Sequence, residues 1–278
     1  MFRVLNLVCA AVAAATIVLT ASLAALAQGA APDRCLAFAE APSRPLIQKA
    51  SVRLMALKPF QVEIRYLGHS TFLMTSPKGV TMATDYNDYI TVQPAPTIAT
   101  MNIAHHTHHS MNPDPKIKHL LKGWNPTPDK AQIHDLTERD VRVRNIPTNL
   151  RSFGDESGFM KYGNSIFVFE VSGLCIAHLG HLHHTLTVQQ LGQIGQMDIV
   201  LVPVDGSFTL DVAGTMEVLK ALKAPLVLPM HYFSEFTLAR FIEEAQKSFV
   251  VKRLQSSQLT VARDQMPAKT EVWVMPNG

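Results

Sequence analysis

The chain has 278 residues, of which 47% are hydrophobic and 17% are charged, and its formal net charge is +3. This length and composition suffice for one large domain or two small ones with a sizeable buried core. The basic residues are scattered rather than gathered into a stripe with interleaved aromatic residues, so the charge argues against a nucleic-acid partner.

The first 27 residues have the pattern of a secretory signal peptide. An early cation, Arg3, precedes an apolar run that ends in Ala25-Leu26-Ala27, and signal peptidases cleave after small residues at this spacing. We therefore expect cleavage after Ala27, a periplasmic or secreted protein, and no stable membrane association afterwards. The alternative is an uncleaved membrane anchor, because the apolar run is long enough to span a bilayer.

Residues 28–55 are rich in alanine and proline and are expected to form a linker to a single domain over residues 56–278. Cleavage would remove Cys9 and leave Cys35 and Cys175. An oxidising compartment permits a disulfide between them, although their separation in sequence leaves the pairing open. Alternation in the surrounding strand places Cys175 among core residues.

The first half of the domain is predicted to consist mainly of strands. Residues 60–68 alternate between polar and apolar side chains, and runs at 70–76 and 79–85 are separated by turn residues. An apolar strand at 96–104 leads into a cluster of histidines. Residues 111–138 contain four prolines and are expected to form a long irregular crossing that acts as a lid.

Strands and helices then alternate. Thr187 and Gln190 have capping-box spacing, and Asp211 is expected to begin the following helix as its N-cap. A hairpin-rich first half followed by an alternating second half predicts an α/β fold with two sheets sandwiched between helices. The predicted strands lie at 140–146, 164–171, 174–178, 198–204 and 225–230, and the predicted helices at 187–196, 211–224 and 234–249.

Polar side chains follow many of these strands directly. His69 follows the first strand, Asp85 ends the third, and His231 follows the last buried strand. Two dense histidine clusters, HHTHH at 105–109 and HLGHLHH at 178–184, also follow strands. If these strand ends meet at one rim, their side chains converge on one pocket, and the rigid sheet edge would hold metal ligands in place.

At these residues the sequence resembles the metallo-β-lactamase superfamily, in particular its branch of ascorbate-phosphate lactonases and phospholipase-D-type enzymes. The stretches that carry the resemblance occur in the order of that branch and together cover roughly residues 58–235. They are YLGHSTFLMTSPKGVTMATD, HHTHHSMN, LCIAHLGHLHH, DIVLVPVDGSFTLD and LVLPMHY. The resemblance implies an αββα sandwich of two mixed sheets flanked by helices, with a metal site at one edge.

The resemblance also implies a set of ligands. The superfamily motif is His-x-His-x-Asp-His, in which the first two histidines and a later one hold one zinc. The Asp-His pair, a bridging Asp and a final His hold the second. One register gives His106, His108 and His178 for the first metal and His231 as the final histidine; the alternative register begins at His105 and places Thr107 at the second ligand.

Several acidic ligands of the superfamily are replaced in this chain. In the first register, Ser110 and Met111 occupy the Asp-His positions, and His181 occupies the position of the bridging Asp. One Zn²⁺ is expected at the three-histidine site. A second site would depend on substitute histidines such as His109 and His181, with His183 and His184 nearby, and nitrogen-only ligation of this kind suits zinc, copper or nickel.

Three further residues have candidate roles, each with an ordinary structural alternative. Asp205 is the acidic candidate for a base or water-orienting group, and it is equally typical of a turn before Gly206. Asp85 is expected to orient a ligating histidine, or to serve as a turn residue. The resemblance places His69 beside the metal pocket, and the alternative is a core histidine.

These features predict an exported metal-dependent hydrolase that acts on an ester, lactone or phosphoester in a small-molecule substrate. The competing hypothesis is a non-catalytic metal- or ligand-binding protein on the same fold, with a degraded second metal site. The oligomeric state is left open.

Overall fold

The computed structural model describes residues 35–36, 57–151 and 158–277. The predicted signal peptide and most of the predicted linker lie outside these residues. In the described part of the chain, no helix is both long enough and apolar enough to cross a membrane.

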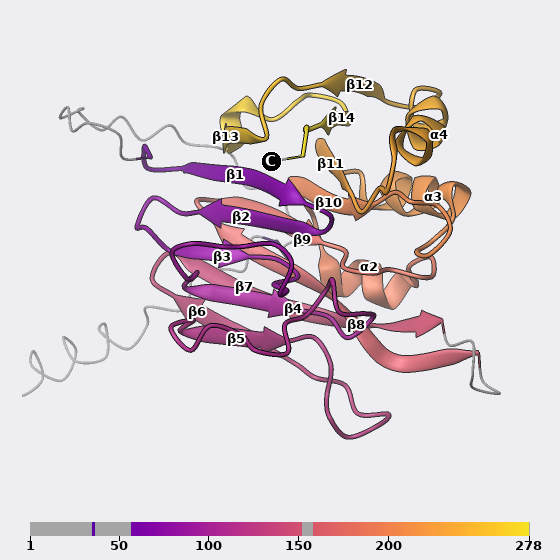
Figure 1. Ribbon diagram of the computed structural model, residues 1–278. Coiled ribbons are helices and arrows are strands. Elements are labelled where there is room, and N and C mark those ends of the chain that lie inside the picture. The colour runs from indigo at the N-terminus through magenta and orange to yellow at the C-terminus, as the bar shows by residue number, and fades with distance from the viewer. Residues whose placement is uncertain (1–34, 37–56, 152–157, 278) are drawn as a thin grey trace, which may run out of the picture.

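Two mixed β-sheets form the centre of the domain (Figure 1). The first has the order β13-β1-β2-β3-β4-β5, and the second has the order β12-β14-β11-β10-β9-β8-β7-β6. The strands are β1 (Gln61–Gly68), β2 (Thr71–Thr75), β3 (Thr81–Ala83), β4 (Ile98–Met101), β5 (His119–Lys122), β6 (Asp135–Glu138), β7 (Val141–Arg151), β8 (Phe159–Val171), β9 (Leu174–His178), β10 (Ile199–Pro203), β11 (Leu226–Met230), β12 (Val250–Arg253), β13 (Gln258–Ala262) and β14 (Glu271–Val274).

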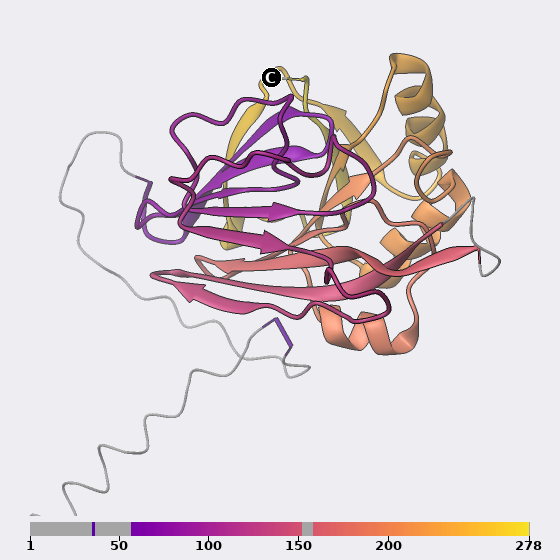
Figure 2. The same cartoon turned by 60° about the horizontal axis from the view of Figure 1, so that its bottom comes forward.

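The sheets stack face to face, as Figure 2 shows, and their inner faces form one apolar core. Val62 and Ile64 of β1 pack in this core together with Phe167 of β8 and Ile199 of β10, all with 0% exposure. β1 alternates between half-buried and buried residues, as expected for a strand with one face in a core. β10 and β11 are buried throughout because helices cover their other face.

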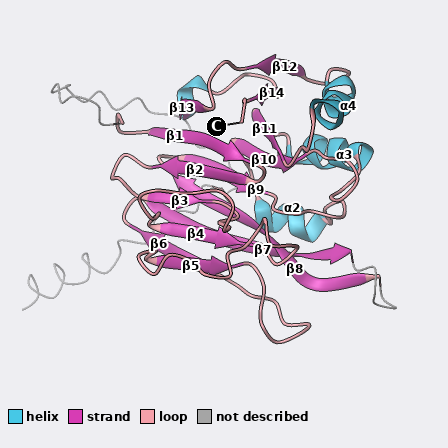
Figure 3. Ribbon diagram, viewed as in Figure 1, coloured by secondary structure: helices cyan, strands magenta, loops and turns pink. Residues whose placement is uncertain are grey.

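Three helices, α2 (Val188–Ile194), α3 (Val212–Leu222) and α4 (Glu235–Ala245), cover the outer face of the eight-stranded sheet (Figure 3). The predicted capping box of α2 is present, and Asp211 caps α3 as expected. A short 3₁₀ helix, η1 (Arg263–Gln265), follows β13. Among the described residues no α-helix packs on the other sheet. Its outer face instead packs against a small cluster that includes Val92 and Tyr86.

The expected fold class of two mixed sheets with helices is therefore confirmed. The expectation that residues 111–138 are wholly irregular is wrong, because this crossing contains β5 and β6. β5 is four residues long and pairs in parallel with β4. It forms a strand because the backbone of β4 is available for pairing, and its own sequence pattern does not indicate a strand. The C-terminal strands β12, β13 and β14 also lie beyond the elements predicted from the sequence.

Cys35 and Cys175 form a disulfide across 140 residues of sequence. Both residues are 2% exposed and belong to the core beneath the helices. The backbone carbonyl of Cys35 also accepts a hydrogen bond from Gln196. One point of the predicted linker is thus covalently attached to β9.

Candidate metal centre

The ends of strands from both sheets meet at one edge and bring histidines together. His69 follows β1, His105 and His108 lie in the turn after β4, and His231 follows β11. Each of these four residues offers a ring nitrogen, and the four nitrogens all lie within 4.8 Å of one another. Imidazole nitrogens this close, on rigid strand ends, could serve as the donor set of a metal centre.

Local backbone conformations at this edge are unusual for side chains with a Cβ atom. His69, Asp85 and His231 have φ values of 50°, 41° and 57°, in the left-handed region. The backbone N–H of His231 donates to the carbonyl of His69 at 2.7 Å, which ties the ends of β1 and β11 together. Such conformations cost free energy, and in proteins they cluster at functional sites.

Two buried carboxylates lie behind two of the histidines. Asp85 Oδ2 lies 2.5 Å from His108 Nδ1, and Asp205 Oδ1 lies 3.1 Å from His231 Nδ1. A carboxylate that accepts the Nδ1 proton leaves the Nε2 lone pair free and fixes the direction in which it points. The two Nε2 atoms of His108 and His231 lie 3.1 Å apart.

Asp205 does not face the space between the histidines. Its carboxylate accepts hydrogen bonds from the backbone of Ser207, Phe208 and Thr209 and from the Thr209 hydroxyl. Burial raises the pKa of Asp205, but the hydrogen bonds from His231 and Thr209 outweigh burial and hold it below its ordinary value. The expectation that Asp205 acts as a base in the pocket is therefore corrected. It caps its turn and orients His231.

Asp85 has the position expected for an orienting residue. It is fully buried, and Asn102 donates to its other oxygen at 2.9 Å. Burial raises the pKa of Asp85, and the histidines beside it and Asn102 oppose this shift. A cation bound to His108 would favour the ionised carboxylate further.

The three histidines expected to share the first metal are not brought together. Of these only His108 belongs to the four-nitrogen group. His106 is exposed and lies beside Tyr89, with ring centroids 5.3 Å apart. His178 is buried behind the site, where its Nε2 atom lies 2.9 Å from the carbonyl oxygen of Ser70. The geometry therefore does not support this ligand set; the nitrogens that do converge with those of His108 belong to His69, His105 and His231.

Of the remaining candidates, His181 is brought to the cluster and His109 is not. The His181 ring centroid lies 4.7 Å from that of His108 and 4.8 Å from that of His105. His109 turns away, with Nδ1 3.2 Å from the carbonyl oxygen of Asn102 and its ring beside Trp124. Thr107, which the alternative register places at the second ligand, has its hydroxyl 2.8 Å from both His69 Nε2 and His105 Nδ1.

Burial favours the neutral form of four histidines at this edge, His69, His105, His108 and His181. It lowers the pKa of His69 to about 3 and that of His105 to about 4, and His231 adds to both shifts. Burial is also the largest cause that lowers the pKa of His108 and of His181. A neutral imidazole is the form that binds a metal ion.

We expect the metal-free protein to lose stability as the pH falls from about 6.5 to about 4. In the unfolded chain His69 and His105 take up protons near their ordinary pKa of 6.5, whereas in the folded chain they do so only near 3 and 4. The unfolded state then binds more protons over this interval, so the free energy of unfolding decreases with falling pH.

Urea unfolding at pH 7.0, 6.0, 5.0 and 4.5 measures this decrease. Replacing His105 with Gln removes one of the titrating rings and should make the decrease shallower. A free energy of unfolding that stays constant from pH 7 to pH 5 would contradict the burial of these rings.

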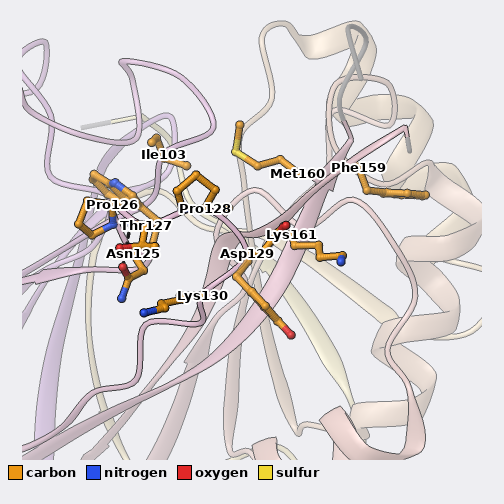
Figure 4. A pocket seen from close by; sticks show the side chains of 13 residues that line it. Ile103, Asn125, Pro126, Thr127, Pro128, Asp129, Lys130, Phe159, Met160 and Lys161 are labelled. Atoms are coloured by element: carbon orange, nitrogen blue, oxygen red, sulfur yellow. Dashed lines mark hydrogen bonds between the residues drawn. The ribbon is translucent and has the colours of Figure 1, made fainter. Parts of the chain in front are cut away.

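A pocket of about 350 Å³ opens near this edge, and the expected lid segment lines one side of it. Figure 4 shows Asn125 and Pro126 on one side and Phe159 and Lys161 on the other. The four clustered histidines do not line the pocket. Its lining residue Ile103 is two residues before His105, whereas its lining residue Trp124 contacts His109, which lies outside the cluster.

A family model described as the β-lactamase superfamily domain matches residues 63–231, from β1 to the histidine after β11. The match covers more than half of the chain. The chain belongs to the metallo-β-lactamase superfamily. Its membership of the lactonase and phospholipase-D-type branch stays a prediction.

Proteins described as metal-dependent hydrolases are similar to parts of this chain. It is 37% identical over 71 residues to a metal-dependent hydrolase of Thermoplasma volcanium, which is 25% of this chain and 31% of that one. It is 34% identical over 97 residues to a metal-dependent hydrolase of Carboxydothermus hydrogenoformans, which is 34% of this chain and 42% of that one. The matches thus span less than half the length of these relatives.

A solved structure covers more of the fold. It is a Thermotoga maritima protein described as a Zn-dependent hydrolase of the metallo-β-lactamase superfamily. It matches with a TM-score of 0.57 and 26% identity, covering 77% of this chain and 98% of that chain.

The superfamily motif fits the observed cluster in a register different from both registers considered above. His105 and His108 are three residues apart, the separation of the third and sixth positions in His-x-His-x-Asp-His. This alignment places Ile103 at the first histidine and Thr107 at the aspartate. Ile103 has no ligand atom, so this member of the superfamily departs from the motif mainly on the side of the first metal.

Proposed function

We propose that this chain is an exported metal-dependent hydrolase that cleaves an ester, lactone or phosphoester bond in a small-molecule substrate. The observation that carries the proposal is the pair His108 and His231. Each ring has a carboxylate at Nδ1, and their Nε2 atoms converge to 3.1 Å.

The pair His108 and His231 suits a metal ion because a cation would attract the lone pairs of both Nε2 atoms. Where each ring donates an Nδ1 proton to its carboxylate and carries no second proton, the two Nε2 lone pairs face each other. A cation between them converts this repulsion into attraction, and orienting carboxylates of this kind accompany metal-binding histidines throughout proteins. His69 and His105 bring further nitrogens to the same space.

We infer one zinc ion held by nitrogen ligands. Zinc accepts imidazole ligands in four-coordinate sites, and a catalytic site leaves one position for water or substrate. When bound, such an ion supplies an activated water and polarises a carbonyl or phosphoryl oxygen. The chain itself fixes the imidazoles of His108 and His231 through Asp85 and Asp205, and burial favours the neutral form of His108.

Aromatic side chains at the edge of the cluster favour a substrate with an apolar part. The Phe233 ring lies 5.1 Å from His231 and 5.7 Å from His69, and Phe208 stands 5.5 Å from Phe233. Phe233 is 55% exposed and Phe208 is 65% exposed. Exposed aromatic rings beside reactive groups offer apolar contact area to a ligand.

Export is supported by the disulfide as well as by the signal-like sequence. Disulfides persist in the periplasm and outside cells and are rare in the cytosol. The Cys35–Cys175 pair joins two buried residues of the folded domain, which supports folding in an oxidising compartment.

The test is to measure zinc content and turnover on the same preparation of the full chain. We expect about one zinc per chain after dialysis against trace-metal buffer, and hydrolysis of chromogenic aryl esters, lactones or phosphodiesters that stops with a chelator and returns with zinc. Aryl and long-chain acyl substrates should have lower KM values than acetyl ones because of Phe208 and Phe233.

A competing function is metal binding without catalysis. It is favoured by Thr107 and His181, which occupy positions where the superfamily motif has aspartates. A chain that takes up one zinc and hydrolyses nothing in the panel would support that alternative. A chain that binds no metal would overturn both.

A further inference from the structure

A chain of hydrogen bonds runs from β7 into the histidine cluster and begins at a backbone amide. The N–H of Arg151 donates to His183 Nδ1, with nitrogens 2.6 Å apart. A backbone amide can only donate, so Nδ1 of His183 must accept. The neutral ring therefore carries its proton on Nε2.

The second hydrogen bond of the series fixes the tautomer of His181. His183 Nε2 lies 2.5 Å from His181 Nδ1, so His183 donates and His181 accepts. Neutral His181 must then carry its own proton on Nε2. That N–H points to His105 Nε2, 3.1 Å away.

The remaining hydrogen bonds of the series run in the same donor-to-acceptor direction. His105, having accepted at Nε2, donates from Nδ1 to the Thr107 hydroxyl at 2.8 Å. The Thr107 hydroxyl in turn donates to His69 Nε2 at 2.8 Å. Every donor in the series meets an acceptor, so the first backbone amide determines the tautomer of every ring.

The hydrogen bonds themselves require neutral rings at His183 and His181, because Nδ1 of each ring accepts an N–H and so carries no proton. His181 is also 3% exposed.

His181 thus differs from His108 and His231 in what it presents to the cluster. Its ring lies 4.7 Å from His108 and 4.9 Å from His231, yet it presents a proton where they present lone pairs. A nitrogen that carries a proton cannot bind a metal ion. In the metal-free chain this proton faces His105 Nε2, and a metal ion that took up that lone pair of His105 would leave the His181 N–H to donate to an oxygen. In His-x-Gly-Asp members of the superfamily, this position holds the bridging aspartate.

We propose that His181 is a catalytic hydrogen-bond donor to a carbonyl or phosphoryl oxygen of the substrate, not a metal ligand, and that His183 is the positioning residue that fixes its tautomer. The proposal rests on the hydrolase function above. Ester and phosphoester oxygens gain negative charge in the transition state, and removing one fixed donor to such an oxygen lowers kcat by about 10²- to 10³-fold.

The first experiment compares His181→Leu with His181→Gln, which retains an N–H donor. Zinc sulfate is titrated into each metal-free chain by calorimetry. We expect zinc Kd values within about threefold of wild type for both variants, a kcat about 100-fold lower for His181→Leu, and an intermediate kcat for His181→Gln. A zinc Kd at least tenfold weaker for His181→Leu would show that His181 is a ligand and would overturn the proposal.

The second experiment needs no turnover. Long-range ¹⁵N–¹H spectra of the metal-free chain should show His181 as the Nε2–H tautomer, and His183→Phe should release that preference. His184→Ala is the matched control, because the His184 ring forms hydrogen bonds with the backbone of Asn149 and Thr185 and takes no part in the series from Arg151 to His69. An Nδ1–H tautomer of His181 in the wild-type chain would overturn the proposal. These two measurements decide the role of His181 even if the chain hydrolyses no substrate in the panel.

Discussion

Replacing His231 with Ala is expected to weaken zinc binding by more than about 100-fold and to abolish hydrolysis. Loss of an outer hydrogen-bond partner of a metal ligand typically costs 10- to 100-fold in affinity, and loss of the ligand itself should exceed that range. Calorimetric titration of the metal-free variant with zinc, together with metal analysis of the purified protein, measures the effect.

His231 is a better residue to replace than His108, because the two substitutions leave different hydrogen bonds on the carboxylate behind each ring. After loss of His231, Asp205 still accepts hydrogen bonds from Ser207, Phe208 and Thr209. After loss of His108, fully buried Asp85 would keep hydrogen bonds from Asn102 and Ser70 but lose its closest partner, so that variant would also lose stability. The His231 variant should therefore fold and report on metal binding alone.

His106→Ala is the matched control, since His106 lies in the same turn but is exposed and outside the cluster. It should bind zinc as the wild-type chain does. Asp205→Asn should fall between the two, with a loss of 10- to 100-fold, because the amide no longer holds the same tautomer of His231. If His231→Ala bound zinc with unchanged affinity, the assignment of the metal centre would be wrong.

The edge where the site forms could be predicted from the sequence, because the relevant side chains directly follow apolar strands. His69 after β1, Asp85 after β3 and His231 after β11 were all expected at one rim, and they lie there. Strand ends can be located from alternation and turn residues, and the ends of neighbouring strands meet at the same edge.

Which of the adjacent histidines faces inward could not be predicted. Residues 105–109 form a tight turn, where neither the helical nor the strand period applies. The direction of each ring is determined by two backbone hydrogen bonds, from His108 N–H to the His105 carbonyl and from Asn102 N–H to the His108 carbonyl. These bonds turn His105 and His108 inward and leave His106 exposed. The i, i+3 spacing within the superfamily motif was the one sequence signal that could have identified this pair.

The C-terminal strands could not be predicted for a different reason. β13 has mostly polar and half-exposed residues and pairs with β1, nearly 200 residues away in sequence. A strand of this kind forms because a partner edge is available to it, and its own pattern is too weak to indicate it.

Reducing the Cys35–Cys175 disulfide is expected to lower the free energy of unfolding by 2 to 5 kcal/mol, with about 5 kcal/mol as the value from chain entropy for a loop of this size. The loop spans 140 residues of sequence, so the bridge excludes many conformations of the unfolded chain. For a domain of this size the loss corresponds to a decrease of roughly 5 to 15 °C in Tm.

Thermal unfolding with and without a phosphine reductant measures this loss, and Cys35→Ser supplies the matched control. The variant should unfold at the temperature of the reduced wild-type chain and should not respond to the reductant. Contacts in the folded state also hold the segment that carries Cys35. Cys35 packs closely on the end of α2, and a Cβ atom at Gly195 would lie 2.0 Å from the carbonyl oxygen of Cys35, so Gly195→Ala should displace this segment. A wild-type Tm that does not change on reduction would mean that residues 35–36 contribute nothing to the stability of the domain, and the structural support for export would be lost with it.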